Sequence, residues 1–384
     1  MNILIEGWRR INHSFALVNQ WQILELQKSN KLYFKDIPFL SKKWDSKINA
    51  SGFEDEKKNL IEKIALPTKD QIHDITYRIS FPFDFNEKFN SKLLFVYGIC
   101  EYKFVYESNY KNNTPYTLKK NKNIFIHTPT QWAKGGFINS GFDENQIIVV
   151  NHGIDQDTFY IISDERKENV RKKYGFKSDD FILTNIGAMT ANKGVELLIA
   201  AYGILKKENK NLKLILKDQS NLYGIGTNHL FKKLLNSELN KKFKAINDDM
   251  MKDITIISEN LTQSEIRELY SISDCYVSPY FAEGFNLTPL EAAACGTQIL
   301  VTKGGATDDY FDNCMGYQIE GVEKKTNNLH VVEPRFDSLV NILKEKVINK
   351  PDSLKKERSN FTHKNNSWAI VVNKLNEEFK NKLR

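Results

Sequence analysis

The first half of the chain alternates short apolar segments with a segment of helical periodicity. Asn2–Glu6 is an apolar run that predicts a buried strand, and Phe15–Leu26 carries apolar residues at helical spacing. Five more runs, most of them bounded by glycine or proline, are expected to be strands: Lys31–Ile37, Ile75–Phe81, Lys92–Tyr97, Ile124–His127 and Gln146–Val150. This alternation is typical of an α/β domain.

A second alternating series follows the charged stretch Ser163–Lys173. Its expected strands are Phe181–Gly187, Leu212–Lys217, Ile254–Ser258, Cys275–Val277 and Gln298–Thr302, with helices at Gly194–Lys206, Ser264–Ser271 and Pro289–Cys295. Strands separated by helices imply parallel sheets that are covered on both faces. The fold class is therefore predicted as α/β, with two facing Rossmann-like domains that bind ligands in the cleft at the carboxyl ends of their strands.

The domain bounds follow from these two series. We expect an N-terminal Rossmann-like domain over residues 1–160 and a C-terminal one over residues 161–365. The lysine- and glutamate-rich segment Ser41–Asp70 is predicted to be a helical insertion. Residues 366–384 are expected to form a last helix, with an apolar stripe of Val371, Val372, Leu375 and Phe379.

Composition excludes several classes of protein. Of 384 residues, 41% are hydrophobic and 27% are charged, which is ordinary for a globular chain and argues against disorder. The net charge of +7 is spread along the chain, so no dedicated nucleic-acid surface is expected. No apolar run is long enough to span a bilayer, and the amino terminus does not resemble a signal peptide. The four cysteines are far apart, so a reducing cytosol is the expected compartment.

The most specific motif runs from Glu283 to Glu291. Thr288 followed by Pro289 reads as an N-cap and the first position of a helix, so a glycine-containing loop is expected to end at a helix amino terminus. Such a junction is a natural anion site. Glu291 has two readings on local sequence alone, because Thr288-x-x-Glu291 is also a capping box in which the carboxylate only returns to the helix start.

A second strand–loop–helix junction lies at Gly187–Gly194. Lys193 precedes the predicted helix and suits a diphosphate leaving group that gathers negative charge. The alternative is a solvated lysine in front of a helix.

These motifs resemble those of family 4 retaining glycosyltransferases, which have the GT-B fold. The Glu-x7-Glu pattern at Glu283 and Glu291 carries the resemblance, together with Gly187–Gly194, Gly304-Gly305 and the segment Gly153-Ile154-Asp155. The resemblance implies that Glu291 accepts hydrogen bonds from the donor ribose and that Glu283 lies beside the reacting sugar. It implies that the loop residues Gly284, Phe285, Asn286, Leu287 and Thr288 face the diphosphate and donor sugar, together with Lys193 and Gly187. It also implies that the last helix, residues 366–384, crosses back to the first domain, and the alternative is a helix packed on its own domain.

One position departs from the family pattern. Ala188 stands where the family usually has an arginine that binds the diphosphate, and Lys217 at the end of its strand is our candidate for the missing cation. Asp155-Gln-Asp157 is formally an Asp-x-Asp metal motif, but its place in the crossover favours a turn, so no obligatory metal or other cofactor is expected.

The first domain is expected to bind the acceptor, and here the sequence is less specific. Arg9, Arg10 and His13 follow the first predicted strand and are the acceptor-side candidates; Arg78 and Glu101 are weaker ones.

The resemblance therefore implies a retaining, metal-independent glycosyltransferase that moves a sugar from a nucleotide-diphosphate sugar to a glycan, lipid-linked or other acceptor hydroxyl. A role in surface glycan, polysaccharide or glycoconjugate synthesis is expected, in the cytoplasm, with peripheral membrane contact left open. Two alternatives stay open: a GT-B sugar-nucleotide epimerase, and a non-catalytic nucleotide-sugar- or glycan-binding relative, which Ala188 favours. The sequence does not define the base, the sugar, the acceptor, the linkage or the oligomeric state.

Overall fold

The computed structural model describes residues 1–42, 44–244 and 246–384 of the chain. The chain divides into two compact units. The first comprises Met1–Asp155, Thr326–His330 and Asn366–Arg384, and the second comprises Gln156–Lys325 and Val331–Asn365. Each unit is built around one parallel sheet of six strands, so the predicted pair of α/β series is confirmed.

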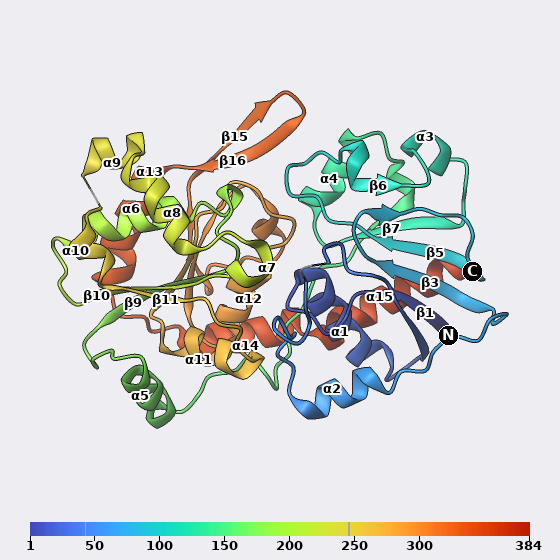
Figure 1. Cartoon of the computed structure of the whole chain (residues 1–384), viewed down its shortest axis with the longest axis horizontal. Helices are drawn as coiled ribbons and strands as arrows, with labels where there is room; N and C mark the ends of the chain where they lie inside the picture. The colour runs from blue at the N-terminus through green and yellow to red at the C-terminus, as the bar shows by residue number, and fades with distance from the viewer. Residues whose placement is uncertain (43, 245) are drawn as a thin grey trace. The chain divides into compact units, whose positions relative to one another are not determined.

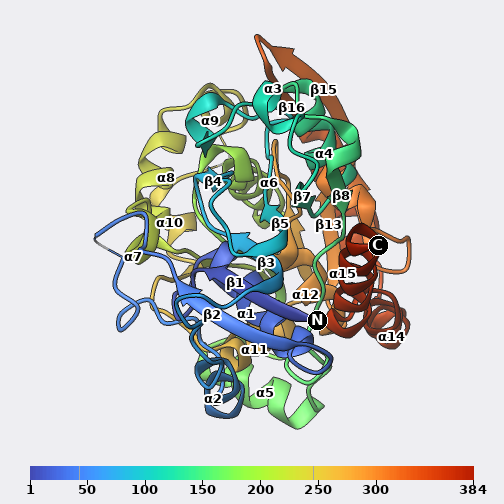
Figure 2. The ribbon, with the colours of Figure 1, turned by 90° about the vertical axis from the view of Figure 1, so that its right-hand side faces the viewer.

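The sheet of the first unit has the strand order β2-β1-β3-β5-β7-β8, whose labels follow one another across the sheet in Figure 2. Its strands are β1 (Asn2–Gly7), β2 (Lys31–Asp36), β3 (His73–Ile79), β5 (Ser91–Tyr97), β7 (Ile124–Thr128) and β8 (Ile147–Val149). A separate pair of short strands is formed by β4 (Phe83–Asp84) and β6 (Tyr110–Lys111). All the predicted strands of this half are present, with ends that shift by one or two residues.

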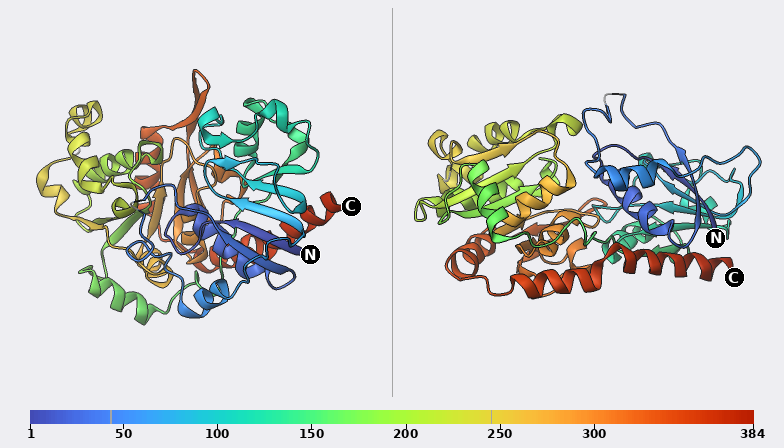
Figure 3. Two further views of the ribbon diagram at one scale, coloured as in Figure 1. Left: turned by 45° about the vertical axis from the view of Figure 1, so that its right-hand side comes forward. Right: turned by 90° about the horizontal axis from the view of Figure 1, so that it is seen from below.

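The helices of the first unit are α1 (Ser14–Leu26), α2 (Asp55–Glu62), α3 (Pro115–Leu118), α4 (Gln131–Asn139) and α15 (Trp368–Leu383). The C-terminal helix α15, red in Figures 1 and 3, lies along the first sheet, where Phe379 packs against Tyr77 and Phe95. Its apolar stripe is buried, as its spacing predicts. The predicted helical insertion Ser41–Asp70 contains only the helix α2, and its residue 43 lies outside the described residues.

The second sheet has the order β11-β10-β9-β12-β13-β14. Its strands are β9 (Phe181–Ile186), β10 (Leu212–Lys217), β11 (Ile254–Ile257), β12 (Cys275–Ser278), β13 (Gln298–Thr302) and β14 (Gly316–Ile319). The strands β15 (Gly321–Thr326) and β16 (Leu329–Pro334) form a separate two-stranded sheet, which is labelled in Figure 1. The strands β14 to β16 were not predicted, because their polar residues hide the apolar signal of a strand.

Helices surround the second sheet. They are α5 (Asp164–Lys173), α6 (Val195–Lys206), α7 (Ser220–Tyr223), α8 (Thr227–Leu235), α9 (Glu238–Phe243), α10 (Asp248–Met251), α11 (Gln263–Ile272), α12 (Leu287–Ala294), α13 (Phe336–Ile342) and α14 (Lys355–Asn366). Buried apolar side chains of β9, β12 and β13, among them Leu183, Val277 and Leu300, pack with those of α6 to form the core of this unit. The core fixes the strands whose carboxyl ends carry the predicted motifs.

Candidate active site

The strand order of the second sheet creates a switch point between β9 and β12. The chain leaves β9 toward β10 on one side and leaves β12 toward β13 on the other. Loops that diverge in this way open a crevice at the carboxyl ends of the strands, which is where ligands bind in such sheets. The two predicted motifs occupy these two loops.

Backbone hydrogen bonds join the two loops directly. The carbonyl oxygen of Asn192 accepts from the backbone N–H of Phe281 at 2.8 Å and from that of Ala282 at 3.3 Å. The side-chain amide of Asn192 donates to the carbonyl oxygen of Ala282 at 3.0 Å. Sequence reasoning missed Asn192, although its position next to Lys193 could have pointed to it.

This junction brings Lys193 and Glu283 together as an ion pair. The side chain of Glu283 is only 7% exposed, so its carboxylate is largely removed from water. The side chain of Lys193 is 26% exposed, so its ammonium group reaches the carboxylate from the solvent side. A buried carboxylate needs such a partner. The two residues predicted for the reacting centre therefore lie in contact, although they are 90 positions apart in sequence.

Gly194 is required where the Lys193 loop turns into α6. Its φ angle is 64°, and a Cβ atom there would lie 2.0 Å from the carbonyl oxygen of Pro279. We expect Gly194→Ala to lower the free energy of unfolding by about 2–4 kcal/mol, because left-handed backbone strain adds to a steric clash. Urea unfolding measures this loss.

Gly175 provides the matched control for that substitution. Its φ angle is 76°, but nothing lies within 4 Å of a Cβ atom placed on it. Gly175→Ala should therefore cost only the backbone strain, about 1–2 kcal/mol. Equal losses in the two variants would mean that the close approach of Pro279 to Gly194 has no energetic effect.

The helix that follows Glu283 begins differently from our prediction. It starts at Leu287, and its N-cap residue is Asn286 with a φ angle of 66° and no side-chain capping bond. The prediction of Thr288 as N-cap is thus wrong, because asparagine tolerates the left-handed conformation and lets the helix start earlier. The hydroxyl of Thr288 instead accepts from the Tyr276 hydroxyl at 2.7 Å.

Glu291 is also not part of a capping box. Its carboxylate accepts a hydrogen bond from the hydroxyl of Tyr270 at 2.8 Å, and the residue is only 7% exposed. Burial raises the pKa of Glu291 to about 7, although the bond from Tyr270 lowers it. This carboxyl group lies one turn into α12 and is not used to start the helix, and its contact with a donor ribose stays a prediction.

This pKa predicts an unusual pH dependence of stability. The unfolded chain loses the Glu291 proton near pH 4.5 and the native chain keeps it to about pH 7, so the native state binds more protons between these values. The free energy of unfolding should therefore fall by about 3 kcal/mol as the pH rises through this window, through this group alone. In Glu291→Gln the free energy of unfolding should not show this decrease. Urea unfolding of both proteins at pH 5 and pH 7.5 measures how much more the free energy of unfolding falls in the original protein than in the variant.

Glu238→Gln is the control, because the Glu238 side chain is 88% exposed. Its effect on stability should be the same at both pH values within a few tenths of a kcal/mol. A pH-independent difference between the original protein and Glu291→Gln would contradict the burial of a protonated Glu291.

The loop from Gly284 to Thr288 is held by contacts that the sequence did not reveal. The Asn286 amide donates to the Ser278 hydroxyl at 2.9 Å, and the Tyr310 hydroxyl donates to the carbonyl oxygen of Asn286 at 2.8 Å. The rings of Phe285 and Tyr310 lie 5.0 Å apart. Backbone N–H groups in the first turn of a helix, here those of Leu287 and Thr288, have no acceptor inside the helix.

Lys217 ends β10 and Gly187 directly follows the neighbouring strand β9, and the backbone N–H of Gly187 donates to the carbonyl oxygen of Lys217 at 3.0 Å. The ammonium group of Lys217 donates to the carbonyl oxygen of Asp218 at 2.6 Å, and the residue is 2% exposed. Burial lowers the pKa of Lys217. A buried cation therefore lies at the predicted edge, and its proposed role in place of the arginine missing at Ala188 stays a prediction.

The acceptor-side candidates of the first unit take part in local structure. Arg9 forms two hydrogen bonds with Asp36, at 2.9 and 3.0 Å, and Arg10 forms two with Glu62, at 2.6 and 2.7 Å. His13 caps α1 by accepting from the backbone N–H of Phe15 at 3.2 Å, and burial lowers its pKa to about 4. The structure shows these structural contacts, and contact with an acceptor stays a prediction.

The described residues contain neither a cluster of metal ligands nor a helix that could span a membrane. Across residues 1–42, 44–244 and 246–384, no three histidine, cysteine or acidic side chains gather as metal ligands would. In the same part of the chain, no helix is both long and apolar enough to cross a membrane.

A model of a known family matches part of the second unit. Residues 166–345, slightly less than half of the chain, match the family model "Glycosyl transferases group 1". The resemblance drawn from Glu283, Glu291 and Lys193 is thereby confirmed at the level of the group.

Curated relatives match parts of the chain. D-inositol 3-phosphate glycosyltransferase of Pseudarthrobacter chlorophenolicus is 28% identical over 182 residues, which are 47% of this chain and 40% of that protein. Lipopolysaccharide 1,2-N-acetylglucosaminetransferase of Salmonella typhimurium is 23% identical over 260 residues, which are 67% of this chain and 62% of that protein. The chain thus matches less than two thirds of the length of either relative.

The fold is shared over the whole length of a solved structure. The crystal structure of Anabaena HepE in complex with UDP and glucose superposes with a TM-score of 0.65 at 13% identity, and the match covers 99% of both chains. The predicted fold class, α/β with two Rossmann-like domains of the GT-B type, is confirmed.

Proposed function

We propose that this protein is a retaining glycosyltransferase that needs no metal ion and uses a nucleotide-diphosphate sugar as donor. The observation that carries the proposal is the meeting of Lys193 with Glu283 at the switch point of the second sheet, with Glu291 one turn into the helix that follows. The match of residues 166–345 to the glycosyltransferase family supports it.

The proposed donor site uses charges that are already in place. The Lys193 ammonium group faces the Glu283 carboxylate, and a bound diphosphate would give it a second anionic partner. The lysine and the backbone N–H groups of the first turn of α12 would stabilise the charge that develops on the departing phosphate. Glu291 would accept hydrogen bonds from the donor ribose, and Glu283 would lie beside the sugar.

The reaction step itself needs no protein nucleophile in this proposal. The acceptor hydroxyl attacks the anomeric carbon on the face from which the diphosphate leaves. The bond from that carbon to the phosphate oxygen breaks, and this oxygen takes the acceptor proton. Charge stabilisation by preorganised groups, rather than acid–base chemistry by a side chain, would supply the rate enhancement.

The first unit is proposed to bind the acceptor, which we assign to the hydroxyl-bearing glycans, lipid-linked sugars or related molecules of glycoconjugate synthesis. The names of the two curated relatives, which act on an inositol phosphate and on lipopolysaccharide, support this class. Contact with a membrane surface would follow from a lipid-linked acceptor.

Donor binding tests the proposal first. We expect one of the UDP-, GDP-, ADP- or dTDP-sugars to raise the melting temperature in the presence of EDTA, and Glu291→Ala to raise the KM for that donor about 10- to 150-fold, the range for one hydrogen bond to a charged group. Unchanged donor binding in Glu291→Ala would contradict the role of Glu291. Conversion of the donor to an epimerised free nucleotide sugar would contradict transfer, and a requirement for a divalent metal would contradict metal independence.

A further inference from the structure

The second unit contains a cavity at the opposite edge of its sheet from the candidate active site. The cavity volume is about 530 Å³, and its wall includes Phe181 and Gln298, the first residues of β9 and β13. The candidate active site follows the carboxyl ends of β9 and β12, about one strand length away, or ~16 Å for five residues. A volume of this size is typical of sites that hold small molecules.

The two carboxylates of the cavity wall are already paired with buried arginines. Asp274 accepts a hydrogen bond from Arg171 at 2.9 Å and another from the backbone N–H of Ile182 at 2.8 Å. Asp352 accepts two hydrogen bonds from Arg358, both at 2.8 Å. The side chains of Arg171 and Arg358 are 8% and 0% exposed, so their charges neutralise these acids from behind the wall.

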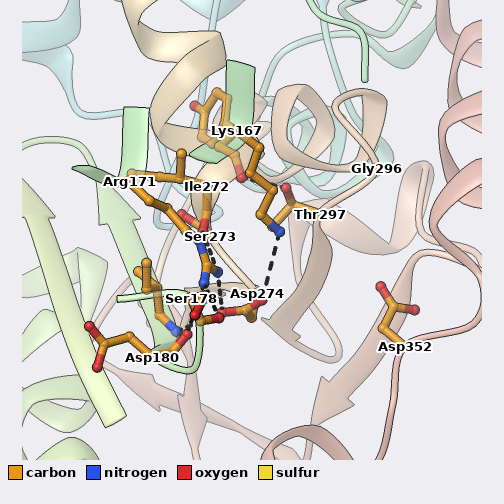
Figure 4. A network of polar contacts seen from close by, with 12 residues as sticks. Lys167, Arg171, Ser178, Asp180, Ile272, Ser273, Asp274, Gly296, Thr297 and Asp352 are labelled. Atoms are coloured by element: carbon orange, nitrogen blue, oxygen red, sulfur yellow. Dashed lines mark hydrogen bonds and ion pairs between the residues drawn. The ribbon is translucent and has the colours of Figure 1, made fainter. Parts of the chain in front are cut away.

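The lysines of the same wall are paired less closely than these arginines. The ammonium group of Lys167 lies 4.0 Å from the nearer oxygen of Asp274, beyond hydrogen-bond length, and its side chain is 25% exposed. Figure 4 shows it directed at Asp274, whose carboxylate is bonded to Arg171. Lys350 and Lys355 also line the cavity, together with Asp352.

Lys167 lies among charges of both signs. Burial lowers its pKa most, Asp274 and Asp164 raise it, and the neighbouring charges of Arg171 and Lys355 lower it. A partly buried ammonium group close to other cations gains more from an anion than an exposed one does, because water screens it less.

We propose that this cavity binds a small phosphorylated molecule, with the phosphate held by Lys167 and Lys355 and its polar remainder in contact with Gln298 and Asn349. Lysine binds phosphate as a point charge, and a dianion matches two lysines whose neighbouring acids, Asp274 and Asp352, are already bonded to buried arginines. The volume of the cavity accommodates more than a bare phosphate ion. This site uses none of the residues of the proposed donor site and does not depend on the proposed function.

Isothermal titration of the full chain with glycerol 3-phosphate tests the proposal, with inorganic phosphate as the minimal anion and glycerol as the neutral control. We expect glycerol 3-phosphate to bind, inorganic phosphate to bind more weakly, and glycerol to give no heat. Lys167→Met and Lys355→Met should each weaken binding about 10- to 150-fold, because each removes one charge-assisted contact. Methionine keeps the length of the apolar part of the lysine side chain. If Lys167→Met loses stability, Lys167→Arg, which keeps the positive charge, should still bind glycerol 3-phosphate.

Two control variants separate this cavity from other anion sites. Lys232→Met removes the same charge from an exposed position on α8, and Lys193→Met removes it from the candidate active site. Neither should change the affinity for glycerol 3-phosphate more than about twofold, which is within the effect of a distant screened charge. No heat from either phosphate at millimolar concentration would overturn the proposal. Binding that Lys193→Met weakens while Lys167→Met and Lys355→Met do not would assign the phosphate to the active site and would also overturn it.

Discussion

Lys193→Met is expected to lower kcat by about 10²- to 10³-fold on the preferred donor. The proposed role of Lys193 is to stabilise charge on the departing phosphate, and removal of one preorganised charge-stabilising donor has an effect of that size. The ion pair with Glu283 fixes the lysine at the switch point of the sheet. Steady-state kinetics with the donor identified by thermal shift measures the loss.

The same substitution leaves the buried carboxylate of Glu283 without its partner, so a loss of stability must be separated from a loss of catalysis. We expect Lys193→Met to be less stable than the double variant Lys193→Met/Glu283→Gln, because the neutral amide does not need a cation. The double variant should regain stability and stay inactive. Lys232→Met, an equal charge change at an exposed position, should keep full activity. Recovery of activity together with stability in the double variant would contradict a role of the lysine in the reaction.

Arg358→Met is expected to cost about 3–5 kcal/mol of unfolding free energy, the largest stability effect that we predict. The Arg358 side chain is 0% exposed, and it donates to the carbonyl oxygens of Met315 and Gly296 at 2.9 and 2.7 Å as well as to Asp352. Its loss removes one donor from each of these acceptors and the counter-charge from Asp352, and removal of one partner of a buried pair has a cost in this range. Chemical unfolding followed by circular dichroism measures it.

Arg335 offers the matched comparison in the same unit. Its side chain is 55% exposed, and its contacts with Glu320 and Asp337 are 3.5 and 3.9 Å long. Arg335→Met should therefore cost less than about 1 kcal/mol, as is usual for surface ion pairs. Similar losses in both arginine variants would show that burial of Arg358 does not determine its contribution.

Much of the fold was predictable because apolar runs mark buried parallel strands. Leu212–Lys217 and Gln298–Thr302 were predicted with the bounds that the structure has. Both faces of these strands are covered, so their sequences are nearly continuous apolar runs and do not alternate between apolar and polar residues. The hairpin strands Gly321–Thr326 and Leu329–Pro334 were missed because they carry charged residues and lie outside the main sheets. The helix content of Ser41–Asp70 was overestimated, because charge and helical spacing alone do not require a helix.

The candidate site was predictable where residue types stand at fixed spacing in one loop, as Glu283 and Glu291 do. The sequence could not show that Tyr270 bonds to Glu291 or that Asn192 joins the two loops, because these contacts depend on tertiary packing. It also left open whether Glu291 caps the helix, and the left-handed Asn286 decides this by moving the helix start to Leu287. Local rules favoured Thr288 as the cap, and the fold of the loop overrode them.

Release of the nucleoside diphosphate from a nucleotide sugar is the most direct measurement of the central claim. We expect the protein, in the presence of EDTA, to release the diphosphate slowly from one of the UDP-, GDP-, ADP- or dTDP-sugars, and the double variant Lys193→Met/Glu283→Gln to release none although it remains folded. Release by this double variant at the rate of the original protein, or no release from any of the four donors by the original protein, would contradict it.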